Sequence, residues 1–408
     1  MVSSFRVLCA LALTPSLMTL ATSCSANSRI EQAQNPSVAA QSQSSVQTVN
    51  IPHTPVKWQS IGNCWAYAAL GWVESMMLRG TNEPLPNFSE SYVTYRHYEV
   101  QLNGLRSNEV QTGGSFEEAT ELIIRYGLMI ESDFAPDEAN LSRSERQKRA
   151  TAIINESLKT GPLAKSRSFE TIRAELDRAF GVDMNALEGK IIKASSLKVP
   201  MGGGATAPLS EVMPSWREVV WPVSYTKYPN EPQVGEKPFA QWDGNVSELQ
   251  RRALRRVMRA MNAGYPVVMN WFVDFNGMTP LGTFELSAVQ KALTQGRQGY
   301  HSTVLEDYLA KGVDPVTQLP FETPEGEVSN ELKSKAVEFG SLTAFIVKNS
   351  WGGAERQDRS SYQRDGEKGY HKLSADYLFA FLPQFNEKSG RFEGYTTGVN
   401  SFVVPPGF

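Results

Sequence analysis

The segment QSIGNCWAYAALGWVESMMLRG, residues 59–80, places a cysteine where a helix supports reactive chemistry. Gly62–Asn63 is a turn and capping signal, residues 65–78 have the pattern of a helix, and Gly80 is placed as its terminator. Cys64 is therefore expected in the first helical turn. There the helix dipole and free backbone N–H groups lower the pKa of a thiol, so Cys64 is a candidate nucleophile.

The cysteine count bears on the role of this residue. The chain has three cysteines, of which Cys9 lies in an apolar N-terminal run and Cys24 lies at its end. Removal or modification of that region leaves Cys64 without a disulfide partner. A lone cysteine is most often a small buried hydrophobe, but in an exported protein an unpaired thiol is an oxidation liability. The second consideration favours a functional Cys64.

A nucleophilic thiol needs a base, and the base needs an orienting group. Of the four histidines, His301 follows a glycine at the entry to a β-rich segment, where an imidazole is well presented. His97 and His371 are interpreted as surface or packed residues. Asn349 follows an apolar strand, and its side-chain oxygen can hold an imidazole N–H in a productive orientation.

These residues together resemble the papain-like cysteine proteases, the peptidase C1 type. The resemblance rests on Gln59, CWAYA from Cys64, His301, and KNSWG around Asn349, in that order. It implies Cys64 as nucleophile, His301 as general base and acid, and Asn349 as its orienter. It also implies that Gln59 donates to an oxyanion hole beside the Cys64 backbone N–H, although only four residues separate the two where the family has five.

Further positions extend the resemblance. Residues 88–95 (FSESYVTY) are similar to a helix start of the family, and Gly113–Gly114 matches its glycine pair. The resemblance implies that Gly113, Gly114 and Trp351 bind substrate, with Trp351 also shielding the His–Asn pair; a plain loop is the alternative for the glycines. Two capping boxes are predicted, at Ser115/Glu118 and Ser247/Gln250. The second opens a helix with an apolar stripe from Leu249 to Met261.

The implied fold is α+β and two-lobed, with a helical lobe around the 64–79 helix and an antiparallel β-barrel lobe carrying His301 and Asn349. The sequence separation of Cys64 and His301 exceeds the family's spacing of ~130–150 residues by roughly a hundred residues. The excess is placed in a helical insertion at about 137–245, reminiscent of the bleomycin-hydrolase branch. It is interpreted as a cap or lid beside the cleft, with a solvent-facing embellishment as the alternative.

The N-terminus has the features of an export signal. Residues 1–23 combine Arg6 with an apolar run of signal-peptide length, and ATSC, ending at Cys24, resembles a bacterial lipoprotein box. Lipidation of Cys24 is expected, with ordinary cleavage after Ser23 or Ala26 as the alternative. Residues 24–50 are expected to be a disordered tether, followed by the peptidase domain at 51–408. The expected location is the cell envelope, periplasmic or outer-membrane side, or the exterior.

Composition excludes several other classes. A net charge of −3 gives no basic footprint for nucleic acid, and the sequence contains no zinc, phosphate-loop or dinucleotide motif, so no cofactor or metal is expected. Two hypotheses remain. The first is a tethered cysteine peptidase acting on peptides or proteins. The second is a non-catalytic peptide- or wall-binding lipoprotein on the same scaffold. Oligomeric state and side-chain preference stay open.

Overall fold

A computed structural model describes residues 47–48, 51–79, 87–104, 107–139, 141, 143–292, 295–353, 360–364 and 366–408. The chain divides into two units, residues 1–44 and 45–408, and all described residues belong to the second. The expectations for the signal peptide, Cys24, most of the tether and Gly80 lie outside the described residues. None of the described helices is long and apolar enough to cross a membrane.

The second unit is a mixture of helices and antiparallel strands, as the α+β expectation requires. Its helices are α1 (Cys64–Leu78), α2 (Glu90–Gly104), α3 (Phe116–Tyr126), α4 (Glu131–Phe134), α5 (Glu145–Lys159), α6 (Pro162–Lys165), α7 (Phe169–Phe180), α8 (Met184–Leu187), α9 (Leu209–Val212), α10 (Glu248–Asn262), α11 (Leu286–Lys291), α12 (Asn330–Phe339) and α13 (Ala375–Phe379).

Within the described residues, the main sheet has nine strands. Seven lie in the order β11-β12-β10-β7-β5-β15-β4, while β6 pairs with β12 and β8 pairs with β7. Their bounds are β4 (Arg217–Val220), β5 (Val267–Asp274), β6 (Thr283–Phe284), β7 (Gln298–Val313), β8 (Pro320–Glu322), β10 (Ser341–Lys348), β11 (Tyr362–Arg364), β12 (Glu367–Ser374) and β15 (Val399–Val404).

Three two-stranded sheets complete the strands. They pair β1 (Gln47–Thr48) with β9 (Glu327–Val328), β2 (Lys198–Gly202) with β3 (Ala205–Pro208), and β13 (Phe381–Phe385) with β14 (Phe392–Thr397).

The expected barrel is not found. Among the described strands, β11 and β4 end the path of the main sheet, which therefore stays open. The edge strand β4 comes from the 137–245 insertion and pairs with β15, from Ser401↔Val220 to Val404↔Arg217. A strand added from the insertion extends this side of the sheet instead of closing it.

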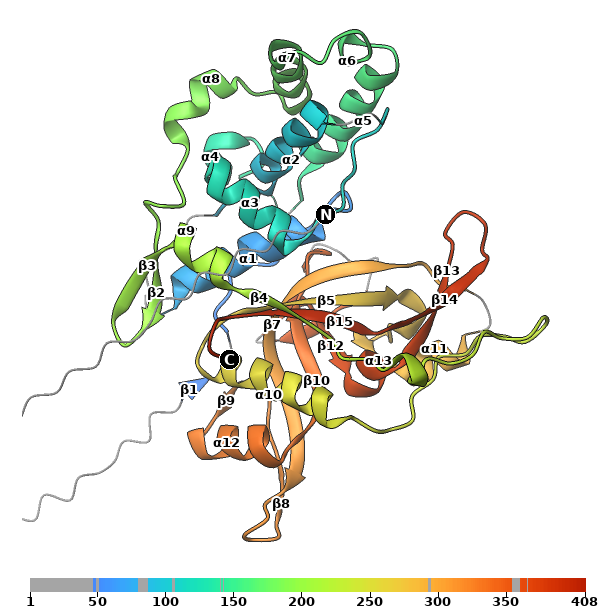
Figure 1. Ribbon diagram of the computed structural model, residues 1–408. Coiled ribbons are helices and arrows are strands. Elements are labelled where there is room, and N and C mark those ends of the chain that lie inside the picture. The colour runs from blue at the N-terminus through green and yellow to red at the C-terminus, as the bar shows by residue number, and fades with distance from the viewer. Residues whose placement is uncertain are drawn as a thin grey trace, which may run out of the picture. The chain divides into compact units, whose positions relative to one another are not determined.

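The sheet has helices on both faces, because alternate residues of a strand point to opposite sides. On β5, Val268 packs in the same apolar cluster as α1, together with Val304 and Val403. Its neighbours Val267 and Met269 belong to the cluster that includes α10. Figure 1 shows α1 on one side of the sheet, and α10 and α12 on the other.

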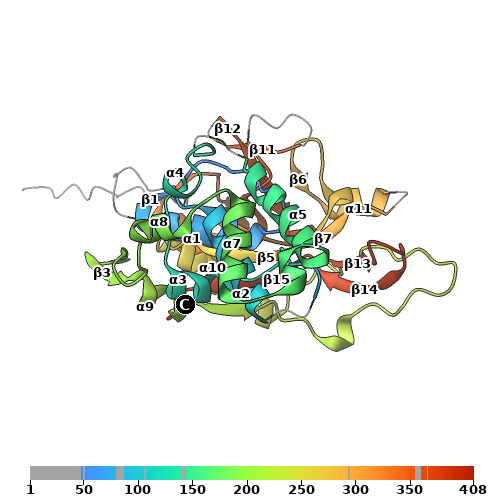
Figure 2. The same ribbon diagram turned by 90° about the horizontal axis from the view of Figure 1, so that it is seen from above.

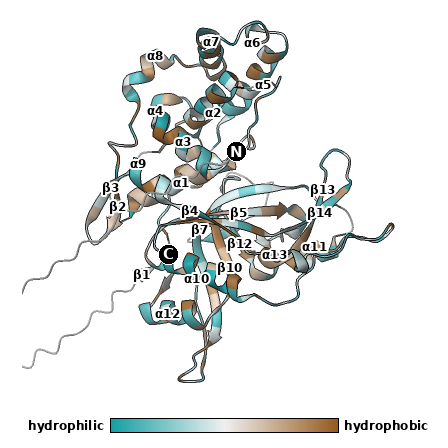
Figure 3. Ribbon diagram, viewed as in Figure 1, coloured by the Kyte–Doolittle hydropathy of each residue, from teal (hydrophilic) through white to brown (hydrophobic). Residues whose placement is uncertain are grey.

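Helix α10 confirms its predicted signals. Ser247 and Gln250 form the reciprocal capping box, and hydrophilic and hydrophobic residues alternate along the helix (Figure 3). The stripe from Ala253 to Met261 is buried, but Leu249, placed in the same stripe, is 59% exposed. Leu249 lies in the first turn of the helix, before the first buried residue, Ala253.

The insertion forms a core of its own with α2. The insertion, predicted to be helical, contains α5 and α7, and their buried side chains pack with Tyr92, Tyr95 and Tyr98 of α2. Viewed from above, α2, α5 and α7 overlap α1 and the sheet (Figure 2). This part of the insertion is therefore integral to the helical part of the fold.

Candidate active site

Cys64 is the first residue of α1, as the sequence predicts. The preceding Asn63 occupies the cap position, but its side chain makes no capping hydrogen bond, which corrects the expected capping role. Its amide Nδ2 instead donates to Thr94 Oγ1 and to Gln147 Oε1, both at 3.0 Å. Because Gln147 lies on α5, the insertion helps to hold the residue next to Cys64.

The thiol of Cys64 is partly exposed and lies against β7. Burial raises the pKa of the thiol, whereas hydrogen bonds from the backbone N–H groups of Ser302 and Trp65 and of Cys64 itself lower it; the net direction is upward. This is opposite to the lowering expected from the helix start alone. Desolvation of a charged sulfur outweighs the backbone donors, so the thiol needs a further partner to become a thiolate.

His301 and Asn349 meet as the sequence predicts. His301 Nε2 lies 2.7 Å from Asn349 Oδ1, and the pair is buried, at 5% and 2% exposure. Asn349 Oδ1 also accepts the backbone N–H of Ser350 at 2.7 Å, which fixes the orientation of the amide. Since Oδ1 only accepts, His301 carries its hydrogen on Nε2 and leaves Nδ1 as the proton-accepting nitrogen.

Trp351 covers this pair. Its ring stacks on the His301 imidazole with centroids 4.7 Å apart and planes at 26°. The indole is 7% exposed, so the His301–Asn349 hydrogen bond lies under an aromatic shield. That position matches the shielding role expected for Trp351.

Asn349 has a second histidine behind it. Its Nδ2 donates to His371 Nδ1 at 3.1 Å, and His371 Nε2 lies 3.2 Å from the carbonyl oxygen of Ser360. The His371 ring is 2% exposed and contacts Trp351 edge to face at 5.0 Å. His371 is thus a packed residue, as expected, but its link to the site was not foreseen.

Gln59 is brought to the same loop. Its backbone N–H donates to Ser350 O at 2.8 Å, and its Oε1 accepts from Ser350 Oγ at 2.5 Å. Its Nε2 donates to Ile61 O at 2.9 Å. One of the two amide hydrogens is therefore used within the loop, and the other is the one an oxyanion would receive.

Gly114 packs against Trp65, the residue after Cys64, and Gly113 directly precedes Gly114. Trp65 Nε1 donates to Thr112 O at 2.9 Å. A Cβ on Gly114 would approach the Trp65 ring to 2.6 Å, whereas a Cβ on Gly113 would meet nothing within 4 Å. Gly114 is therefore required by packing, and Gly113 offers an open backbone to a ligand.

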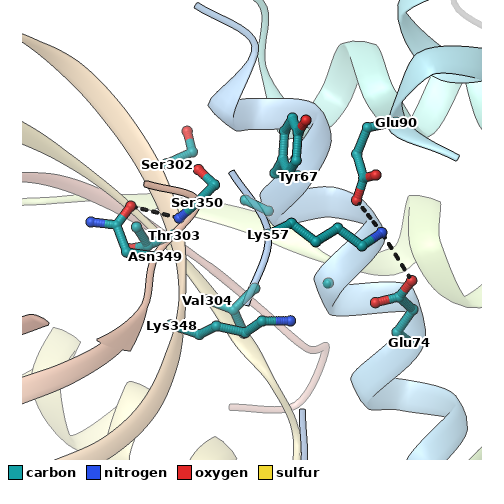
Figure 4. A pocket seen from close by; sticks show the side chains of 12 residues that line it. Lys57, Tyr67, Glu74, Glu90, Ser302, Thr303, Val304, Lys348, Asn349 and Ser350 are labelled. Carbon is teal, nitrogen blue, oxygen red and sulfur yellow. Dashed lines mark hydrogen bonds and ion pairs between the residues drawn. The ribbon is translucent and has the colours of Figure 1, made fainter. Parts of the chain in front are cut away.

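A cluster of charged residues lies next to the site, between α1 and the strands (Figure 4). Lys57 Nζ lies 2.6 Å from Glu90 Oε1 and 3.8 Å from Glu74 Oε1. Lys348 Nζ donates to Thr54 Oγ1 at 2.9 Å, and Thr54 in turn donates to Glu74. We call Lys57, Glu74, Glu90 and Lys348 the charged cluster.

The charged cluster surrounds a cavity of about 30 Å³, room for about one water molecule. Burial lowers the pKa of Lys57, but the carboxylates of Glu90 and Glu74 outweigh it and raise that pKa above the ordinary lysine value. Burial lowers the pKa of Lys348 to about 8. Sequence reasoning missed this cluster, although two lysines adjacent to the motif residues Gln59 and Asn349 were its available signal.

The other two histidines have structural partners. His97 is buried, packs edge to face on Trp65 at 4.8 Å, and lies 3.3 Å from Glu118. His53 Nδ1 lies 3.0 Å from Ser75 Oγ on α1. His301 differs from the other three histidines in that the N–H of the next residue, Ser302, bonds to the Cys64 thiol. No group of His, Cys, Asp or Glu side chains that could hold a metal ion occurs within the described ranges.

Comparison with known proteins gives a distant likeness. No protein-family model matches the chain, and no curated protein matches it. Among solved structures, the chain is similar to "Xylellain, a cysteine protease from Xylella fastidiosa", with 12% identity and a TM-score of 0.37, over 88% of this chain and 85% of that chain. Similarity at this level establishes no activity, so the chemistry rests on the geometry of the site itself.

Proposed function

We propose that the protein is a cysteine peptidase that hydrolyses peptide bonds through Cys64, His301 and Asn349 on a two-lobed, papain-like fold. The observation that carries the proposal is the 2.7 Å contact of His301 Nε2 with Asn349 Oδ1, beside a thiol that accepts the N–H of Ser302. The proposal assigns the roles of nucleophile, base and orienting amide to three residues from distant parts of the sequence.

The reaction follows from these positions. His301 Nδ1 takes the proton of the Cys64 thiol as the sulfur attacks the carbonyl carbon of the substrate. The Cys64 backbone N–H at the helix start and the second amide hydrogen of Gln59 stabilise the negative oxygen. His301 then protonates the leaving amine, and water, deprotonated by His301, hydrolyses the thioester to release the acid and the thiol.

Replacement of Cys64 by Ala tests this assignment. We expect kcat for peptide hydrolysis to fall on the order of 10⁶-fold while the melting temperature changes little, because the thiol is a reactant. An epoxide- or vinyl-type electrophile should form a covalent adduct with Cys64, seen as a mass increase of one inhibitor molecule per protein. A Cys64→Ala variant that retains turnover would disprove the proposal and leave the non-catalytic peptide- or wall-binding alternative.

The raised pKa of Cys64 makes His301 decisive for its reactivity. An imidazolium next to the sulfur lowers the thiol pKa, and its removal leaves the effect of burial. The rate of iodoacetamide alkylation against pH should therefore rise at a higher pH in His301→Ala than in wild type, above the ~8.5 of a free thiol. Coincident profiles would show that His301 and Cys64 do not interact.

Export and anchoring belong to the same proposal. We infer that residues 1–23 are removed, that Cys24 becomes lipidated, and that the peptidase acts from a membrane tether at the cell envelope. Intact mass of the protein purified from membranes tests this. A diacylated N-terminal Cys24 supports the tether, whereas an unmodified start at Cys24 or Asn27 indicates a secreted form.

A further inference from the structure

A cavity of about 350 Å³ lies beside the candidate active site and is walled in part by the insertion. One wall is the start of α3, with Ser115 and Phe116, directly after Gly113 and Gly114. The opposite wall is formed by residues 213–218 of the insertion, ending in β4. This cavity is therefore shaped by a segment that a peptidase without the insertion would lack.

Hydrogen bonds connect the cavity to the nucleophile. Asn270 of β5 lines the cavity and is the cross-strand partner of Ser302 on β7. Ser302 Oγ donates to Asn270 Oδ1 at 2.6 Å, and the Ser302 N–H bonds to the Cys64 thiol. We consider a peptide whose backbone lies at Gly113 and whose scissile carbonyl lies at Cys64. A side chain of that peptide next to the scissile bond can reach the cavity.

The cavity is acidic at its rim. Glu117 and Glu121 of α3 and Glu218 of β4 line it and are exposed. Glu218 Oε1 accepts from Ser401 Oγ and lies 3.4 Å from Asn270 Nδ2, which places its carboxylate on the Asn270 side. The single basic residue in the lining, Arg217, is held to the backbone, because its Nη1 donates to the carbonyls of Pro214 and Trp216.

The remaining walls are apolar. Phe116, Met213 and Trp216 line the cavity and are buried against the α1 side of the sheet. A side chain suited to this shape has a long apolar stem that packs on these residues and a positive head that reaches the carboxylates. Lysine and arginine have this character.

We infer that this cavity selects peptides with a lysine or arginine side chain close to the scissile bond, and that Glu218 from the insertion is a specificity-determining residue. The inference rests on the proposed function, since it makes the cavity a subsite of that active site.

Peptide pairs that differ only in lysine or norleucine test the inference, because norleucine keeps the stem and removes the charge. The pair is placed in turn at each of the three positions before the scissile bond. At one position we expect kcat/KM to favour lysine about 5- to 30-fold, as befits 1–2 kcal/mol of interaction. Each of Glu218→Gln and Glu121→Gln should lower this ratio about 2- to 5-fold.

The control is Glu322→Gln, an exposed carboxylate on β8 outside the cavity, which should leave the ratio unchanged. Equal turnover of lysine and norleucine peptides at all positions would overturn the inference but not the peptidase proposal. If no peptide is cleaved, the peptidase proposal fails instead. In that case, calorimetry measures how tightly the Cys64→Ala variant binds the lysine and the norleucine peptide. Equal dissociation constants would refute the inference.

A second inference comes from a different observation, the hydrogen bonds around Asn349. We propose that His371 is a positioning residue that keeps the Asn349 amide turned toward His301. Asn349 Nδ2 donates to His371 Nδ1, and the Ser360 carbonyl beside Nε2 favours the tautomer with its hydrogen on Nε2. An amide turned by 180° would place Nδ2 against the His301 N–H and face two donors to each other.

Two variants of His371 separate positioning from packing. His371→Phe removes the acceptor and keeps a ring, so kcat should fall about 5- to 30-fold, as for a lost interaction of 1–2 kcal/mol, while KM is unchanged. His371→Gln keeps an acceptor on its side chain and should recover much of kcat. An unchanged kcat in His371→Phe, or equal losses in both variants that follow their melting temperatures, would refute the positioning role.

Discussion

The candidate active site and the charged cluster share three segments of the chain but differ in how their polar groups are compensated. Each of the three segments contributes one residue to the cluster and one to the site. These are Lys57 and Gln59, Glu74 and Cys64, and Lys348 and Asn349, with the cluster residue given first. In the site, His301 and Asn349 are joined by a hydrogen bond, and Cys64 is half-buried.

The charged cluster instead places two lysines and two carboxylates around a cavity of about 30 Å³, with Lys57 in ion pairs with both carboxylates. Glu74 and Glu90 are 1% and 5% exposed, so each depends on its partners for compensation. We therefore expect substitutions in the site to change the stability of the protein little, and substitutions in the cluster to lower it strongly. Four substitutions or pairs of substitutions can break or sharpen this contrast.

The largest expected effect is on activity. His301→Ala should lower kcat by roughly 10⁴-fold and Asn349→Ala by roughly 10²-fold, the two ends of the range for general acid–base catalysis. Orienting a base matters less than supplying one. Steady-state kinetics on one peptide, with thermal unfolding as a control for intact folding, would measure both. Reversal of the order would place the base elsewhere.

The next effect is on stability. Lys57→Met leaves Glu90 and Glu74 facing each other with one cation fewer, and should lower the free energy of unfolding by about 3–5 kcal/mol. The matched control is Lys335→Met, whose ion pairs with Asp314 and Glu331 are nearer the surface, with an expected cost of about 1 kcal/mol or less. Urea unfolding compares the two, and equal losses would show that the cluster is not special.

The third effect depends on pH. The pKa of Lys348 is lowered to about 8 in the folded protein, while the unfolded chain keeps a value near 10.4. Between these values the unfolded state binds more protons, so stability should rise with pH across that window. The difference in unfolding free energy between wild type and Lys348→Met, followed from pH 7 to roughly 10.4, isolates this contribution. A difference that does not vary with pH would mean that Lys348 is charged throughout.

The smallest effect distinguishes two neighbouring glycines. A Cβ at position 114 meets the Trp65 ring, so Gly114→Ala should cost about 1–3 kcal/mol of stability. A Cβ at position 113 meets nothing, so Gly113→Ala should leave stability unchanged and raise KM by narrowing the space for a peptide backbone. If Gly113→Ala leaves KM unaltered, the glycine belongs to a plain loop.

What could be predicted from the sequence follows local rules. The start of α1 at Cys64, the α3 cap at Ser115 and the α10 capping box depend on neighbouring residues, and each is found. The meeting of His301 with Asn349 was foreseen from a resemblance of motifs, not from spacing. The other pairings between distant segments carried no such motif in the sequence.

Three features escaped prediction for that reason. The side chain of Asn63 bonds to α5 instead of capping α1, and His371 reaches Asn349 from the adjacent strand β12. The strand β4 joins the main sheet at its edge, so the expected barrel is an open sheet. Each of these depends on which segments lie side by side, and hydrophobic periodicity does not encode that.

The position of β15 within the sheet has a consequence for the order of folding. This strand, Val399–Val404, lies between β5 and β4, so β4 and the edge of β5 that faces away from β7 have no partner in the sheet before β15 arrives. The pairing of β15 with β4 spans about 180 residues of chain, a separation that slows folding. During synthesis the edges of β5 and β4 therefore remain unpaired until residue 404 is available. The sheet is therefore completed only after the last of its strands has been synthesised.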